Sequence, residues 1–252
     1  MINFKYKYDM PLDSVERTLA HKEILRTKSF LRKNYLFWYD FLVQDFGSKS
    51  PDEILEIGSG GGFLKEVLPG IITSDIQPIA GVDRCFPATE MHLNDQSLQG
   101  ICMVNVFHHI DEADKFLIEA SRVLKPDGRI IMVEPANTIW SRFVYLKFHH
   151  ENFDVKGGWK FLSDGPLTSS NITLPWIVFI RDRALFKNRF PEFEIESIDF
   201  HNSFQYILSG GFSYRTVVPG FLFGVLHFID RWLCWISPQF AMFMTIKVRK
   251  LF

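Results

Sequence analysis

The residues with the most evident chemical potential form the segment 56–62, EIGSGGG. Apolar residues stand on both sides of it, with Ile54 and Leu55 before and Phe63 and Leu64 after. This pattern predicts a short buried strand, a glycine turn and a helix. Backbone N–H groups at such a helix start lack partners and favour a ligand that carries anionic oxygens, and glycine lets the ligand approach closely. The segment therefore predicts a ligand-binding turn beside an acidic side chain.

The spacing of the glycines narrows the choice of ligand. A dinucleotide fingerprint that starts at Gly58 requires Gly or Ala at position 63, where the sequence has Phe63. A phosphate-binding P-loop requires Gly-Lys-Ser/Thr at the helix start, and no such run is present. The remaining pattern is an acid followed by alternating glycines, and a turn without ligand is the alternative.

Composition limits the class of partner. The chain has 252 residues, 47% of them apolar, and a formal net charge of −1. The sequence contains no run of Lys and Arg that would create a local positive patch despite this net charge, so we expect no nucleic-acid partner. The three cysteines lie far apart, and segment 1–5 begins no apolar leader, so we expect a cytoplasmic chain without disulfides.

Strands and helices must position this turn. Near-continuous apolar runs predict parallel strands at 54–58, 71–76, 80–86, 101–106 and 129–134. Helices are expected within 13–46 and at 111–124, further strands at 194–201 and 240–248, and mostly helical structure at 203–236. We predict an α/β fold in a single domain, 1–252, divided into N-terminal helices (1–47), a binding core (50–135), an insertion after the fifth strand (136–192) and a late segment (193–252).

The glycine segment and the strands after it resemble the class I S-adenosylmethionine-dependent methyltransferases. The resemblance implies a three-layer Rossmann-like fold with a mostly parallel seven-stranded sheet, a final antiparallel hairpin, and S-adenosyl-L-methionine as cofactor. It places Asp75 at the ribose hydroxyls, since a carboxylate accepts two hydrogen bonds, and Glu56 near the methionine amino group. The cofactor-binding residues that it implies are Glu56, Gly58, Ser59, Gly60, Gly62, Asp75, Ile76 and Asn105.

One position departs from the family pattern. Related sequences carry an Asp for the adenine amino group where this chain has Pro87, which offers no side-chain acceptor. Asp83 is a candidate substitute. The alternative to an enzyme is therefore a non-catalytic module that keeps the fold for binding or as a scaffold.

The catalytic residues are less defined than the cofactor site. Methyl transfer from a sulfonium mainly requires that the acceptor be positioned and water excluded, so a dedicated base is not obligatory. Where the acceptor must lose a proton, His108, His149 and His150 are the candidates, each with an ordinary wall or loop role as the alternative. No metal is expected.

Aromatic residues point to the kind of acceptor. The chain has 26 Phe, 7 Tyr and 6 Trp, and we expect a cap over the site lined by residues such as Trp38, Tyr39, Trp140, Trp159 and Phe204. Such a cap favours a small-molecule or lipid-linked apolar acceptor. The segment 203–252 combines aromatic residues with five basic residues and one acid, a combination typical of peripheral contact with the inner membrane face. A buried helix followed by a last core strand is the alternative interpretation of the same residues. The longest apolar run of this segment, 217–229, is too short to span a bilayer.

Overall fold

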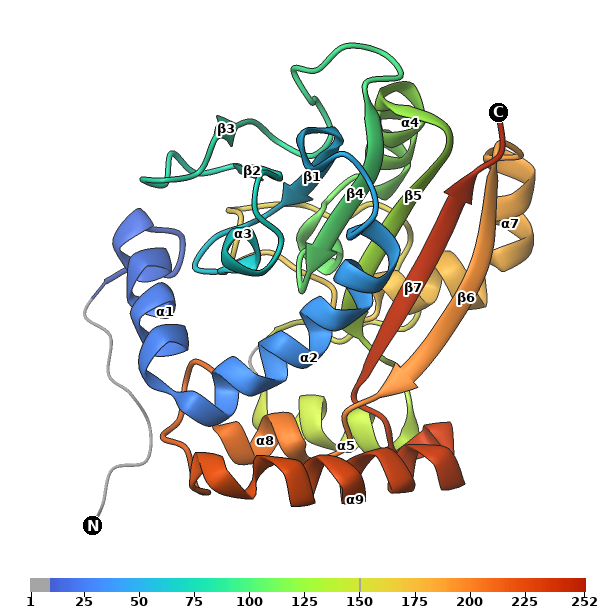
Figure 1. The fold of residues 1–252 in the computed structure, drawn as a ribbon. Coiled ribbons are helices and arrows are strands. Elements are labelled where there is room, and N and C mark those ends of the chain that lie inside the picture. Colours follow the sequence, from blue (N-terminus) through green and yellow to red (C-terminus); the bar gives the residue numbers. More distant parts are fainter. Residues whose placement is uncertain (1–9, 150) are drawn as a thin grey trace.

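The computed structural model describes residues 10–149 and 151–252, and it contains a seven-stranded sheet (Figure 1). The strands lie in the order β3-β2-β1-β4-β5-β7-β6. Neighbours from β3 to β5 are parallel, whereas β7 pairs antiparallel with both β5 and β6. The strands are β1 (Ile54–Ile57), β2 (Ile72–Asp75), β3 (Arg84–Cys85), β4 (Leu98–Val104), β5 (Leu124–Pro135), β6 (Phe193–His201) and β7 (Phe243–Lys250). The predicted fold class is confirmed.

Helices cover the two faces of the sheet. They are α1 (Val15–Thr27), α2 (Ser29–Phe46), α3 (Leu64–Val67), α4 (Ala113–Val123), α5 (Ile139–Phe148), α6 (Leu174–Trp176), α7 (Arg183–Arg189), α8 (Gln205–Ser209) and α9 (Phe223–Ile236). Successive side chains of β4 enter opposite cores: Ile101 packs with α4, whereas Cys102 packs with α2. This alternation explains why the strand is apolar throughout.

The region after β2 differs from the expected repetition of strand and helix. No helix forms between Gln77 and Ser97, and α3 has only 4 residues. Pro78, Gly81 and Pro87 interrupt this stretch, and each disfavours a continuous helix. The ends of β1 and β2 are consequently bordered by loops rather than by long helices.

The N-terminal helices close over that open end. Ser14 caps α1 by accepting a hydrogen bond from the Arg17 backbone N–H at 3.2 Å. Helix α1 passes so close to the glycine turn that a Cβ on Gly61 would lie 2.6 Å from the backbone nitrogen of Lys22. Lys28, between α1 and α2, donates to the backbone oxygens of Gly211 and Tyr214 and joins these helices to the C-terminal segment. The N-terminal addition therefore lies over the ligand edge of the sheet.

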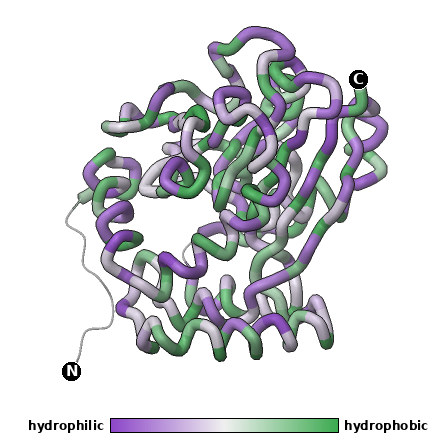
Figure 2. Tube along the Cα trace, viewed as in Figure 1, coloured by the Kyte–Doolittle hydropathy of each residue, from purple (hydrophilic) through white to green (hydrophobic). Residues whose placement is uncertain are grey.

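Helix α9 lies along one end of the molecule, beside α8 (Figure 1). Its Asp230 is 1% exposed and accepts the backbone N–H groups of Ser203 and Phe204, each at 2.8 Å. Figure 2 shows hydrophobic residues recurring along this helix at the edge of the molecule. Among the residues that the structure describes, no helix combines the length and apolar character that crossing a bilayer requires.

Candidate functional site

A cavity of about 400 Å³ opens at the C-terminal ends of β1, β2 and β4. This is the edge where doubly wound sheets bind their ligands. The glycine turn and the strand ends form one wall, α1 and α2 form another, and segments from 145–172 and 206–213 complete it. Residues from distant parts of the chain therefore share a volume typical of a small-molecule site.

The glycine turn is shaped by its backbone. Gly58 has a φ of +64°, and a Cβ there would lie 2.5 Å from a methyl carbon of Val106. A larger residue would be both strained and overpacked. The Ser59 N–H donates to the Ser74 carbonyl oxygen at 2.9 Å, so the turn is held against the end of β2.

Asp75 ends β2 and faces this turn. One of its carboxylate oxygens accepts the Gly60 N–H at 2.9 Å, and the other accepts the Gln77 N–H at 2.9 Å. Burial raises its pKa, although these hydrogen bonds favour the charged form. Each oxygen keeps a further lone pair, so the fixed carboxylate is able to accept two hydroxyl groups from a ligand.

Glu56 lies deeper in the same wall. It is 5% exposed, and burial raises the pKa of its carboxyl group to about 7. No cation among the described residues contributes to lowering that pKa. A buried acid without a positive partner is costly, and a ligand ammonium group would supply the missing charge. The site thus fits a cofactor that carries an amino group at one end and a ribose at the other.

The structure brings together all eight residues assigned to the cofactor. Each lines the cavity: Glu56, Gly58, Ser59, Gly60, Gly62, Asp75, Ile76 and Asn105. Pro87 lines it as well, next to Ala88 and Thr89. Asp83, the candidate substitute for adenine recognition, instead bonds Lys65 and Thr73 and is not part of the cavity wall.

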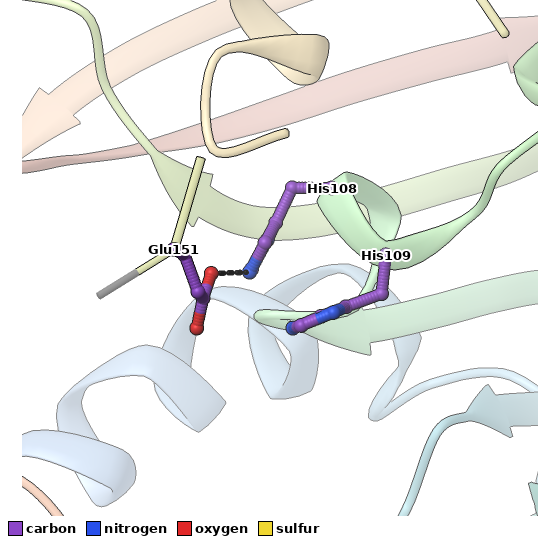
Figure 3. A group of neighbouring side chains, drawn as sticks. All are labelled: His108, His109 and Glu151. Carbon is purple, nitrogen blue, oxygen red and sulfur yellow. Dashed lines mark ion pairs between the residues drawn. The ribbon is translucent and has the colours of Figure 1, made fainter. Parts of the chain in front are cut away.

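A cluster of two histidines and a carboxylate forms another part of the cavity wall (Figure 3). His108 lies on the 3-10 turn Phe107–His109 after β4, and its Nδ1 is 2.6 Å from Glu134 Oε2. Its Nε2 is 3.3 Å from Glu151 Oε2. Burial lowers the pKa of His108, but the two carboxylates outweigh burial and raise it. The imidazole is therefore held between two acids.

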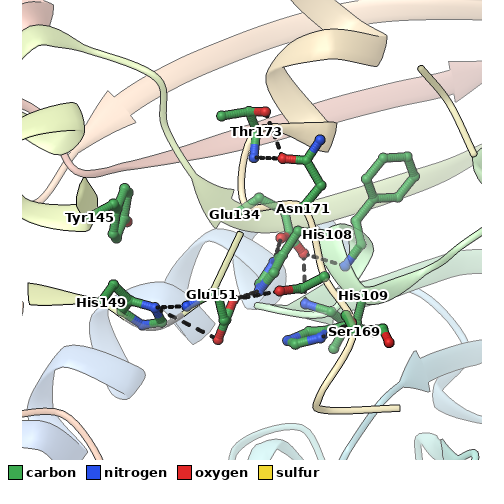
Figure 4. Close-up of polar contacts among 12 residues, drawn as sticks. His108, His109, Glu134, Tyr145, His149, Glu151, Ser169, Asn171 and Thr173 are labelled. Atoms are coloured by element: carbon green, nitrogen blue, oxygen red, sulfur yellow. Dashed lines mark hydrogen bonds and ion pairs between the residues drawn. The ribbon is translucent and has the colours of Figure 1, made fainter. Parts of the chain in front are cut away.

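The neighbouring histidines differ in their surroundings (Figure 4). His109 Nδ1 lies 3.0 Å from the Ser169 carbonyl oxygen, and burial, with the nearby charge of His108, lowers its pKa to about 4. His149 lines the cavity, and its Nδ1 accepts the Glu151 N–H at 3.3 Å. His150 lies outside the described residues. Two of the three proposed catalytic histidines therefore lie at the cavity.

Sequence reasoning missed the two acids of this cluster. Glu134 is completely buried at the end of β5, and a charge that ends an apolar strand run was a usable signal. Glu151 had no comparable signal, because its position depends on how the insertion folds back toward β4. The Asn171 N–H donates to the His108 carbonyl oxygen at 2.9 Å and holds the insertion against the turn after β4.

The predicted aromatic cap is wrong in most of its members. Trp38, Trp140, Trp159 and Phe204 do not line the cavity, and only Tyr39 does. Trp38 is fully buried in the core, and Trp159 packs against Phe190. The aromatic residues that line the cavity are mainly tyrosines: Tyr35, Tyr39, Phe86, Tyr145, Tyr206, Phe212 and Phe243. Aromatic content alone did not separate core from cavity, because both environments favour such side chains.

Comparisons with known proteins agree with this geometry. Residues 55–132, less than half of the chain, match the family described as "Methyltransferase domain". A putative methyltransferase from Haloferax volcanii, solved with its activator Trm112, has 12% identity and a TM-score of 0.52, with 94% of this chain and 97% of that chain covered. At this identity the likeness shows the fold alone.

Two further solved structures align with lower scores. A methyltransferase from Aquifex aeolicus has 16% identity and a TM-score of 0.45, covering 74% of this chain and 92% of that chain. Geranyl diphosphate C-methyltransferase from Streptomyces coelicolor has 11% identity and a TM-score of 0.47, covering 85% of this chain and 77% of that chain. No curated protein sequence matches the chain significantly.

Substitution of Asp75 tests the ribose position. We expect Asp75→Ala to weaken binding of S-adenosylhomocysteine by roughly 2 to 4 kcal/mol, because two charge-assisted hydrogen bonds are lost. Calorimetric titration measures the change. Asp83→Ala is the matched control, since Asp83 also bonds the backbone of β2 but does not line the cavity. Equal losses in the two variants would contradict the assignment.

The pKa of Glu56 predicts a pH dependence of cofactor binding. The free chain holds a proton on Glu56 below about pH 7, and a neutral carboxyl attracts an ammonium group less strongly. Affinity for S-adenosylhomocysteine should therefore rise with pH, by at most about tenfold per unit, and level off above that pKa. In Glu56→Gln, this part of the slope should disappear. Titration of both proteins from pH 5.5 to 8.5 gives the comparison, and identical profiles would refute the role of Glu56.

Proposed function

We propose that this chain, whose residues 55–132 match a methyltransferase domain, is a class I S-adenosylmethionine-dependent methyltransferase that methylates an apolar small-molecule or lipid-linked acceptor. The observation that carries the proposal is the composition of one cavity, whose wall contains a glycine turn with two acids, aromatic rings and a histidine cluster. We assign the glycine turn and its two acids, called the cofactor half, to the cofactor, and the remaining wall, called the acceptor half, to the acceptor.

The cofactor half holds its ligand through charge and backbone. We assign the methionine amino group to Glu56, the ribose hydroxyls to Asp75, and the contacts between them to the glycine turn. Ile76, half-exposed at 52%, offers an apolar surface for the adenine ring. When bound, S-adenosylmethionine supplies an electrophilic methyl carbon that needs no further activation, so the remaining task of the protein is to place the acceptor.

The acceptor half combines apolar walls with a few polar groups. Tyr145 on α5 and Tyr206 on α8 contribute aromatic rings, and Phe212 and Phe243 add apolar surface. Such a wall excludes water and favours an acceptor with a substantial apolar part. The polar groups on this wall include His108, His109 and Glu151. The raised pKa of His108 keeps its ring protonated, so it is not free to accept a proton from the acceptor. A polar sugar alone would gain little from this surface.

The outer surface supports delivery of such an acceptor from a membrane. On α9, Phe228 is 73% exposed and Trp235 is 80% exposed. On α5, Phe143 and Leu146 are 51% and 64% exposed. Both helices contact the short turn Pro238–Phe240, so they belong to one side of the molecule. We call the outward faces of α5 and α9 the apolar surface; large exposed apolar side chains gathered on one face are typical of a contact with a membrane or a partner.

Charges on the apolar surface match an anionic membrane. Arg142 and Lys147 on α5 and Arg231 on α9 are exposed. The sequence of α5 contains no acid, and the single acid of α9, Asp230, is buried. Basic residues beside exposed aromatics favour the interface of anionic lipids. We therefore place the chain peripherally at the inner membrane face, with the apolar surface in contact with headgroups.

Label partition tests the acceptor class. The full chain is incubated with membrane lipid extract and S-adenosylmethionine labelled in its methyl group. We expect label in the organic phase, because the acceptor carries a large apolar part. Asp75→Ala, which should bind the cofactor weakly, is the negative control. A second incubation contains a water-soluble cell fraction in place of the lipid extract. Label that enters only the aqueous phase of this second incubation would contradict an apolar acceptor.

Vesicle flotation tests the membrane surface. We expect the chain to float with vesicles that contain phosphatidylglycerol at low salt, and less at high salt, where the basic residues are screened. Trp232→Ser with Trp235→Ser should reduce flotation, since each lost ring removes about 2 kcal/mol of apolar burial. Ile118→Ser, which changes a residue 61% exposed on α4, should leave it unchanged. Absence of flotation at either salt would refute the membrane contact.

A further inference from the structure

Three side chains that commonly bind metals converge at the cavity wall. They are His108, His109 and Glu151, and one ligand atom from each lies within 4.8 Å of the others (Figure 3). The two histidines come from the turn after β4, whereas Glu151 comes from the segment after α5. The tertiary structure brings Glu151 to the two histidines, because it lies far from them along the sequence.

Outer contacts orient both imidazoles. Glu134 lies 2.6 Å from His108 Nδ1, and the Ser169 carbonyl oxygen lies 3.0 Å from His109 Nδ1 (Figure 4). Each ring keeps a proton on Nδ1, and His108 would give up the Nε2 proton that faces Glu151 when a metal binds, so Nε2 of each ring is the nitrogen for a ligand bond. Metal-binding histidines in proteins are held in this way, by a carboxylate or a backbone carbonyl on the other nitrogen. The two histidines therefore already have the hydrogen-bond partners that hold a metal-binding imidazole in place.

Distances and charge agree with a cation at this place. Two donor atoms of a tetrahedral zinc ion lie about 3.3 Å apart. The separation of His108 Nε2 and Glu151 Oε2 is 3.3 Å, and His109 has to approach by at most roughly 1.5 Å. Glu134 and Glu151 also bring two carboxylates into a largely buried region, and a divalent ion would balance them.

We propose that His108 Nε2, His109 Nε2 and the Glu151 carboxylate bind a borderline divalent transition-metal ion such as Zn²⁺. Imidazole donors favour this class, whereas Mg²⁺ prefers sites made entirely of oxygen. The three residues line the cavity, so the remaining coordination position opens toward the acceptor. There the ion would hold an oxygen atom of the acceptor. This role rests on the proposed function, whereas the binding of the ion itself is independent of it.

Metal titration of the full chain tests the site. Zn²⁺ is titrated against a chromogenic chelator, with S-adenosylhomocysteine binding measured on the same samples to confirm an intact fold. We expect one Zn²⁺ per wild-type chain, and affinity at least about tenfold weaker in His109→Gln and in Glu151→Gln. His92→Gln is the matched control, because His92 is an exposed histidine outside the cavity. Mg²⁺ in excess should not displace the Zn²⁺.

The outcomes separate this inference from the proposed function. S-adenosylhomocysteine binding without Zn²⁺ binding would overturn the metal site and leave the methyltransferase assignment intact. So would Zn²⁺ affinity that is equal in the wild type and in both cluster variants, since the ion would then lie elsewhere. Zn²⁺ bound by the cluster in a chain that labels no apolar acceptor would instead refute the proposed acceptor and support the site.

Discussion

The carboxylate of Glu134 joins the sheet to the reactive end of the cavity. One of its oxygens accepts the backbone N–H groups of Val106 and Phe107, at 2.8 and 2.7 Å, and the other contacts His108. The side chain is completely buried, so breaking any of these contacts would leave a charge or a donor unpaired in a region of low dielectric. The turn after β4 is consequently fixed to β5, and His108 and His109 take their positions from it.

The cofactor half of the cavity was largely predictable from the sequence. Glu56, the glycines and Asp75 lie at the ends of two adjacent strands, and parallel strands present their C-terminal ends at one edge. The spacing of the glycines, with Phe63 where a dinucleotide fold needs a small residue, was enough to choose among ligands. Local sequence thus predicted which residues line this part of the cavity.

The acceptor half was not predictable in the same way. Glu151 reaches His108 only because the insertion returns to β4, and nothing in its local sequence indicates that path. Trp38 and Tyr39 are adjacent on α2, yet one ring fills the core and the other lines the cavity. Small rotations of a helix decide between such positions, and the pattern of aromatic residues in a sequence does not record them.

The position of β7 has a consequence for the order of folding. This strand lies between β5 and β6, with Arg129 opposite Arg249 and Phe193 opposite Lys250. More than one hundred residues separate its segment from β5 along the chain. Strand β6 can join the sheet only through β7, so both must dock after β7 has been synthesised. Contacts between such distant segments are slow to form, and the late docking of this hairpin would leave the edge of β5 exposed in the meantime.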